Sequence, residues 1–201
     1  MKLYYSMGAC SLASNIVLRE AGHSFTLEAV NLGTHTTDTG ADYYTINPKG
    51  YVPALKLDDD SILTEGVAIL LYAASTAKQA HLTPEYGSMA WYRLVELLTF
   101  ISSEIHKGFS PLFNKAITEE ARAAQIEKLH KRFAFVENIL SQSTFLTGET
   151  FTVADAYLYT IMRWSSMLNV DIHEYTHILR FMETVSGRPS VQEALAAEGI
   201  K

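Results

Sequence analysis

The sequence changes character near residue 80, and this change constrains the fold more than any other feature. Before it, short β-type runs alternate with segments of helical period, whereas after it nearly every segment has helical period. The length of 201 residues lies between the usual sizes of one domain and two. The pattern therefore predicts an α/β domain over residues 1–80, a linker over 81–86 and an all-helical domain over 87–201.

The first half predicts an alternating order of strands and helices. A β-type run at 3–5 breaks at Gly8, and apolar residues then recur at helical spacing as far as Ala21. We expect a helix that Glu65 opens and Thr64 caps. Further strands are expected at 25–27, 52–57 and 62–63, and a mostly irregular segment at 31–44. The order is β-α-β followed by β-β-α.

Capping residues mark the helices of the second half. We expect a helix over 88–107 that ends before Pro111, and a second helix that begins after the N-cap residue Thr118. Thr152 and Asp155 have the spacing of a capping box, with Asp in place of the usual Glu, ahead of an apolar helix.

The composition excludes several classes of protein. Hydrophobic residues make up 48% of the chain and charged residues 19%, which is typical of a globular protein. A net charge of −6 disfavours a nucleic-acid-binding protein, which needs a basic surface. No apolar run has the length of a membrane span, and none near the start is long enough for a signal peptide. The single cysteine cannot form an internal disulfide, so we expect a cytoplasmic protein.

That cysteine, Cys10, lies at the predicted turn from the first strand into the first helix, two residues after Gly8. A helix N-terminus favours the thiolate form, which is the nucleophile. The alternative is a buried, inert cysteine. Its place at the turn favours the reactive thiol.

Glu65 and Gly66 open a predicted helix in the same domain. The N–H groups of a helix start bind an anion such as a carboxylate, and the Glu65 side chain can accept an ammonium group. An α-amino acid head group carries both charges. The alternative is a first-turn glutamate that only complements the helix dipole.

The helix before Pro111 has a polar face that includes Thr99, Ser103, His106 and Lys107. Its other face carries a core stripe of leucine and isoleucine. The polar face ends in two candidate cations, His106 and Lys107, and would suit the wall of a cleft for an anionic ligand. The alternative is a solvated helix surface.

A zinc-hydrolase pattern, H-E-x-x-H, occurs at residues 173–177. Two histidines four residues apart on a helix can share a zinc ion. Asn169 and Asp171 precede the match closely, so we expect it to straddle a loop and a helix start, and no histidine follows it. We therefore expect no metal site.

Five segments together resemble the glutathione S-transferases from end to end. Cys10 and the pair His106–Lys107 are similar to those of the bacterial beta class. The segments are KLYYSMGACS at 2–11, NPKGYVPAL at 47–55, LTEG at 63–66, EIHKGF at 104–109 and FTVADA at 151–156.

The resemblance implies a thioredoxin-like N-terminal domain followed by an all-helical C-terminal domain, in a homodimer. It also implies a cis bond before Pro53, which leaves the Val52 backbone to pair with the cysteinyl part of glutathione. Glutathione is then the co-substrate, a small hydrophobic electrophile is its partner, and no cofactor is required. The implied catalytic residues are Cys10 and His106. The implied glutathione-binding residues are Tyr5, Ala9, His35, Val52, Pro53, Glu65, Gly66, Thr99, Ser103, Glu104 and Lys107, with Glu104 reaching from the partner subunit.

The resemblance implies that Cys10 forms a mixed disulfide with glutathione, and that the proton of His106 sets the thiolate fraction. Three positions depart from the family pattern: Met7 replaces a common Pro, His35 a common Lys and Thr99 a common Asn. A different hypothesis is a protein that binds glutathione or apolar ligands with little turnover. Turnover of an aryl halide, as opposed to binding alone, discriminates between the two.

Overall fold

The computed structural model describes residues 1–77 and 82–200. The chain forms two compact units, one made of Met1–Thr83 with Arg188–Lys201 and the other of Pro84–Gly187. We call them the first and the second unit. The boundary after Thr83 falls inside the predicted linker 81–86, but residues 78–81 lie outside the described residues, so the linker stays a prediction.

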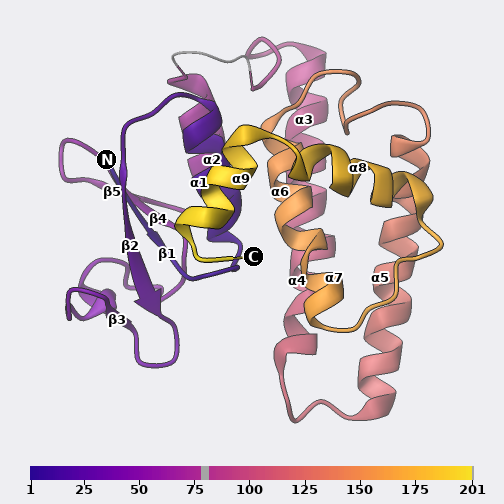
Figure 1. The fold of residues 1–201 in the computed structure, drawn as a ribbon, viewed down its shortest axis with the longest axis horizontal. Coiled ribbons are helices and arrows are strands. Elements are labelled where there is room, and N and C mark those ends of the chain that lie inside the picture. Colours follow the sequence, from indigo (N-terminus) through magenta and orange to yellow (C-terminus); the bar gives the residue numbers. More distant parts are fainter. Residues whose placement is uncertain (78–81, 201) are drawn as a thin grey trace. The chain divides into compact units, whose positions relative to one another are not determined.

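A five-stranded sheet organises the first unit, in the order β3-β2-β1-β4-β5 (Figure 1). The central strand β1 pairs in parallel with β2 and antiparallel with β4. The strands are β1 (Lys2–Tyr5), β2 (Thr26–Asn31), β3 (Thr36–Thr37), β4 (Ala54–Lys56) and β5 (Ile62–Thr64). The predicted β-α-β, β-β-α order is present, with one additional short strand, β3, in the stretch 31–44 that was expected to be mostly irregular.

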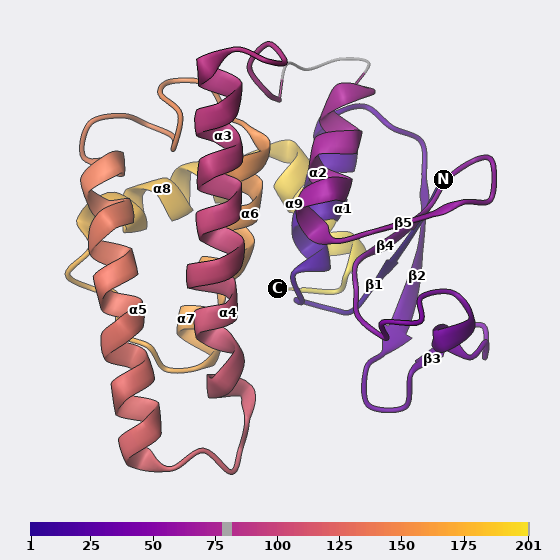
Figure 2. The same cartoon turned by 180° about the vertical axis from the view of Figure 1, so that it is seen from behind.

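Two helices, α1 (Ser11–Glu20) and α2 (Gly66–Ser75), lie side by side against the sheet (Figure 2). Tyr4 belongs to an apolar cluster of buried residues, and its ring centre lies 5.8 Å from that of Tyr43. Tyr43 belongs to a 3-10 helix (Tyr43–Thr45) within the stretch predicted as mostly irregular.

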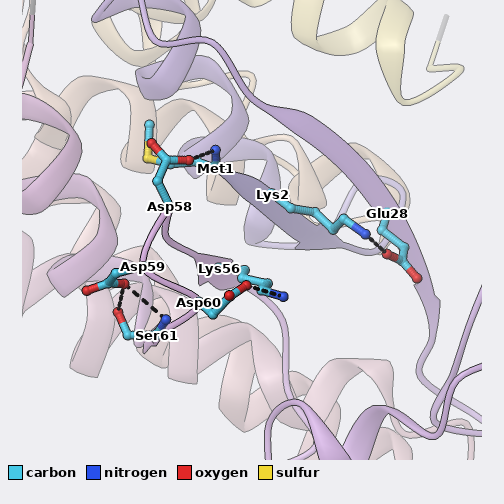
Figure 3. Close-up of polar contacts among 8 residues, drawn as sticks. All are labelled: Met1, Lys2, Glu28, Lys56, Asp58, Asp59, Asp60 and Ser61. Atoms are coloured by element: carbon cyan, nitrogen blue, oxygen red, sulfur yellow. Dashed lines mark hydrogen bonds and ion pairs between the residues drawn. The ribbon is translucent and has the colours of Figure 1, made fainter.

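Ion pairs and hydrogen bonds fasten the strand ends of the first unit (Figure 3). The Met1 ammonium lies 2.5 Å from the carboxylate of Asp58, in the turn between β4 and β5. Lys2 on β1 lies 2.6 Å from Glu28 on β2. These pairs join segments far apart in sequence at the ends of the strands.

The second unit is helical. Its long helices are α3 (Met89–Phe100), α5 (Glu119–Leu140), α6 (Val153–Met162) and α8 (Thr176–Ser186), and its short ones are α4 (Lys107–Phe109) and α7 (Trp164–Met167). The helix predicted over 88–107 is present, but a π-helical turn, Ile101–His106, separates α3 from α4. Pro111 lies in a 3-10 helix, Ser110–Phe113, that follows α4. The Thr118 hydroxyl caps α5 as predicted, accepting the Ala121 N–H at 3.2 Å.

Helix α6 is the centre of the second unit, because all ten of its residues are buried. The predicted capping box at its start is present, and Asp155 is fully buried. Its carboxylate accepts the Thr152 N–H at 2.7 Å and the Thr152 hydroxyl at 2.8 Å, and also the Leu146 N–H at 2.8 Å. Burial raises the pKa of Asp155 to about 6, against the opposing effect of these hydrogen bonds.

Two features differ from the sequence analysis. Thr64 ends β5 and does not cap α2, whose N-cap is Glu65 in a left-handed conformation with φ 71°. The last helix, α9 (Pro189–Ala197), was expected in the all-helical domain over 87–201 but packs on α1 in the first unit. Helical period indicates a helix but not the surface that it covers. Among the described residues, no helix is long and apolar enough to cross a membrane.

We predict that Asp155→Ala lowers the free energy of unfolding by about 2–4 kcal/mol, because it leaves buried N–H groups without an acceptor. Urea unfolding followed by circular dichroism measures the change. Thr118→Ala, which removes an exposed cap, is the control and should cost about 1 kcal/mol. An equal loss in the two variants would contradict the prediction.

Candidate glutathione site

Cys10 is the N-cap residue of α1, as its position after Gly8 predicts. Gly8 has a φ of 69°, which lets the chain turn sharply out of β1. The Cys10 thiol donates to the carbonyl oxygen of Val52, with 3.3 Å between sulfur and oxygen. The cysteine is therefore partly exposed at a helix N-terminus rather than sealed in the core.

A carboxylate from the other end of the chain holds this turn. Glu198 follows α9 and is buried, with 4% of its surface exposed. Its two oxygens accept the Gly8 N–H at 3.0 Å and the side-chain amide of Asn15 on α1 at 3.0 Å. The charge of Glu198 and, above all, burial raise the pKa of Tyr5 at the end of β1. Sequence reasoning did not predict the contact between Glu198 and Gly8, since nothing local indicates an interaction 190 positions away.

The loop before β4 places Val52 and Pro53 beside the cysteine turn. The Val52–Pro53 bond is cis, as the resemblance implies. The carbonyl of the preceding residue, Tyr51, accepts the Tyr43 hydroxyl at 2.8 Å and the Asn47 side-chain amide at 2.7 Å. Burial raises the pKa of Tyr43 to about 12, so this hydroxyl remains a donor at neutral pH.

Glu65 and Gly66 form the start of α2, close to this loop. A Cβ on Gly66 would lie 4.0 Å from Pro53 Cγ. Lys49 Nζ lies 2.6 Å from a Glu65 carboxylate oxygen and 3.0 Å from the Thr64 hydroxyl. Glu65 thus already binds an ammonium group of the protein itself. Sequence reasoning gave Lys49 no role in the site, although the residue lies in the segment 47–55 that carries part of the resemblance.

His35 has a left-handed conformation with φ 52°. Its ring centre lies 4.4 Å from that of Tyr44. Gly50 makes this packing possible, because a Cβ there would come within 2.8 Å of Tyr44 and 3.2 Å of the imidazole. Among the described residues, the buried Nδ1 of His35 has no hydrogen-bond partner.

In the second unit, the polar helix face expected from the sequence spans the π-helical turn. Ser103 and His106 lie in the turn, whereas Thr99 lies in α3 and Lys107 begins α4. The wider turn changes which side chains share a face. The hydroxyls of Thr99 and Ser103 donate to carbonyls one turn back, at 2.8 Å and 2.9 Å. Glu104, which the resemblance assigns to a partner subunit's site, pairs with Arg132 of its own chain at 2.7 Å.

His106 ends the π-helical turn beside Lys107. Its Nδ1 lies 2.7 Å from the Tyr157 hydroxyl on α6, and its ring centre 5.0 Å from that of Trp164. Burial and then the charge of Lys107 lower the pKa of His106 to about 4. The imidazole is therefore neutral at pH 7. The expected pair of cations is corrected to one cation, Lys107, because sequence reasoning could not see the burial of the histidine.

The site residues expected from the sequence thus fall in two sets. Tyr5, Ala9, Cys10, His35, Val52, Pro53, Glu65 and Gly66 belong to the first unit, and Thr99, Ser103, Glu104, His106 and Lys107 belong to the second.

The H-E-x-x-H pattern straddles a turn and a helix start, as expected. His173 lies outside α8 and pairs with Asp171 at 2.6 Å, whereas His177 is the second residue of α8. Within residues 1–77 and 82–200 no group of three or more His, Cys, Asp or Glu side chains is arranged to hold a metal ion.

Comparison with known proteins identifies the family. The family model for the glutathione S-transferase N-terminal domain matches residues 8–76, and that for the C-terminal domain matches residues 100–189. Glutathione S-transferase GstA of Escherichia coli O157:H7 is 44% identical over 201 residues, which cover all of both chains. The bacterial transferase BphK, solved as a ternary complex, is 46% identical with a TM-score of 0.97 over all of both chains. A beta-class transferase of Sphingomonas chungbukensis is 40% identical with a TM-score of 0.96, again over all of both chains.

The chain belongs to the glutathione S-transferase family, and its relatives include the bacterial beta class. The expected fold, a thioredoxin-like N-terminal domain with a helical C-terminal domain, is confirmed. The protein is a glutathione transferase, and this favours an enzyme over the hypothesis of a binding protein.

We predict that His106 makes the protein sensitive to acid. The folded-state pKa of about 4 lies below the ordinary value of 6.5. The neutral ring thus stabilises the folded state above pH 6.5, and this contribution is lost as the pH falls toward 4. Between pH 7 and pH 4 the loss is about 3 kcal/mol. Urea unfolding at pH 7 and pH 4 measures the free energy of unfolding that each protein loses on acidification. This loss should be about 3 kcal/mol smaller in His106→Asn than in the wild type.

The ring-proton NMR shifts of His106 provide an independent check. They should stay constant from pH 8 to pH 5, because protonation begins only near pH 5. A midpoint near pH 6.5 would show that the ring titrates as an exposed histidine.

Proposed function

We propose that the protein conjugates the thiol of glutathione to small hydrophobic electrophiles, as a cytoplasmic detoxification enzyme that works as a homodimer. The single observation that carries the proposal is the grouping in the first unit. There the Cys10 thiol contacts Val52, next to a cis proline, and Glu65 and Gly66 begin helix α2. The electrophile binds through apolar contacts, for which no sequence motif exists.

The tripeptide is bound through its charges and its backbone. The γ-glutamyl ammonium group binds Glu65, and its carboxylate binds the N–H of Gly66 at the positive end of α2. To reach Glu65 the ammonium takes the place of Lys49, a low-cost exchange because the Lys49 and Glu65 side chains are 47% and 66% exposed. The cysteinyl backbone pairs with Val52 as an added strand.

The remaining expected residues serve the rest of the tripeptide. His35 binds the glycine carboxylate, and Tyr5 and Ala9 form the wall beside the sulfur. The resemblance assigns Lys107 to the same tripeptide. Thr99 and Ser103 supply hydroxyl groups. Glu104 assists from a partner subunit, which requires it to exchange its contact with Arg132.

The chemistry is nucleophilic. The glutathione thiol loses its proton, its thiolate attacks the electrophilic carbon, a carbon–sulfur bond forms and the leaving group departs with the bonding electrons. His106 is neutral near pH 7, so it acts by donating a hydrogen bond to sulfur rather than as a cation.

A second activity is thiol–disulfide exchange at Cys10. The Cys10 thiolate attacks one sulfur of oxidised glutathione, a new sulfur–sulfur bond forms, and the second glutathione leaves as its thiolate. The position of Cys10 at the N-terminus of α1 supports this step, because the helix dipole favours the thiolate.

We predict that oxidised glutathione adds one glutathionyl group to the wild type and none to Cys10→Ala, because the chain has no other sulfur nucleophile. Intact-mass spectrometry measures the adduct. Turnover of a generic aryl halide, measured in parallel, separates conjugation from exchange. An unchanged mass shift in Cys10→Ala would refute the role of Cys10.

We predict that Glu65→Gln raises the KM for glutathione roughly tenfold or more, because it removes a charge-assisted hydrogen bond to the ammonium group. Steady-state kinetics with varied glutathione measure the change. The control is Asp60→Asn, which removes another exposed carboxylate of the first unit from its lysine, Lys56, at 2.7 Å. Equal effects of the two substitutions would place the ammonium elsewhere.

A further inference from the structure

His106 is held by a buried tyrosine that no motif of the sequence indicates. Tyr157 lies on α6 with 3% of its surface exposed, and its hydroxyl lies 2.7 Å from Nδ1 of the imidazole. The two rings are nearly perpendicular, in a T-shaped arrangement with centres 5.9 Å apart and an interplanar angle of 88°. Both residues belong to the second unit.

The chemistry of the two groups sets the direction of this hydrogen bond. The ring is neutral near pH 7, so one nitrogen carries a proton and the other accepts one. A phenol is a better donor than acceptor, and an imidazole nitrogen is the stronger base. The Tyr157 O–H therefore donates to Nδ1, and the ring proton lies on Nε2.

Tyr157 is itself firmly positioned. It lies two residues after Asp155, whose buried carboxylate fixes the start of α6. The imidazole also packs against an aromatic group, since the ring centre of Trp164 lies 5.0 Å from that of His106 and 5.9 Å from that of Phe109. Rigid neighbours of this kind keep the ring in one orientation.

We propose that Tyr157 is a positioning residue that holds His106 in the tautomer with the proton on Nε2 and in a fixed ring orientation. Nε2–H is then the hydrogen-bond donor for the sulfur of glutathione. The inference rests on the proposed role of His106, and Tyr157 acts only through that ring.

The test compares Tyr157→Phe with the wild type. The substitution keeps the ring and removes the hydroxyl. Long-range ¹H–¹⁵N spectra of the imidazole should show the proton on Nε2 in the wild type and a mixture of tautomers in the variant. We expect kcat with an aryl halide to fall about tenfold, whereas the KM for glutathione stays within about twofold, because the tripeptide's own contacts are unchanged.

Tyr175→Phe is the matched control. The Tyr175 hydroxyl lies 2.9 Å from Nδ1 of His130, so this variant breaks a similar tyrosine–histidine hydrogen bond in the same unit. It should leave kcat within about twofold of the wild-type value. Equal losses of kcat in the two variants would mean that Tyr157 is only structural, and would overturn the inference.

The spectra test the inference separately from the proposed function. A wild-type spectrum with the proton on Nδ1, or an unchanged spectrum in Tyr157→Phe, overturns the inference whatever the activity. If His106→Asn retains full kcat while the spectra are as expected, the proposed role of His106 is wrong, and the positioning of the ring by Tyr157 stands.

Discussion

The second unit depends on one buried carboxylate. Asp155 fixes the start of α6, a helix with no exposed residue, and α3, α7, α8 and the π-helical turn pack against α6. The carboxylate combines three hydrogen bonds, so a charge that would be costly in the core is satisfied there. The position of Tyr157, and through it that of His106, follows from this anchor.

In the proposed mechanism, the neutral state of His106 limits how this residue can activate the sulfur of glutathione. A cationic imidazole would stabilise a thiolate by its charge, whereas a neutral one offers only a hydrogen bond. In the first unit, the N-terminus of α1 supplies a partial positive charge next to Cys10. The positive end of α1 therefore has a larger part in thiolate chemistry than the sequence suggested.

Local signals predicted most of the fold and the position of Cys10 at a helix start. The alternation of strands and helices, the caps at Thr118 and Thr152, and the helix start at Cys10 are all encoded within a few residues. Features that depend on distant contacts could not be predicted. Lys49 beside Glu65, Tyr157 beside His106, and the packing of α9 on α1 need the folded chain, and so does the depressed pKa of His106.

The contact between Glu198 and Gly8 joins the last helix to the cysteine turn at 3.0 Å. A ribosome makes the turn first and the glutamate 190 residues later. During synthesis the turn therefore lacks this acceptor until the segment that holds Glu198 leaves the exit tunnel. A chain that stops before Glu198 would have a cysteine turn that this carboxylate does not hold.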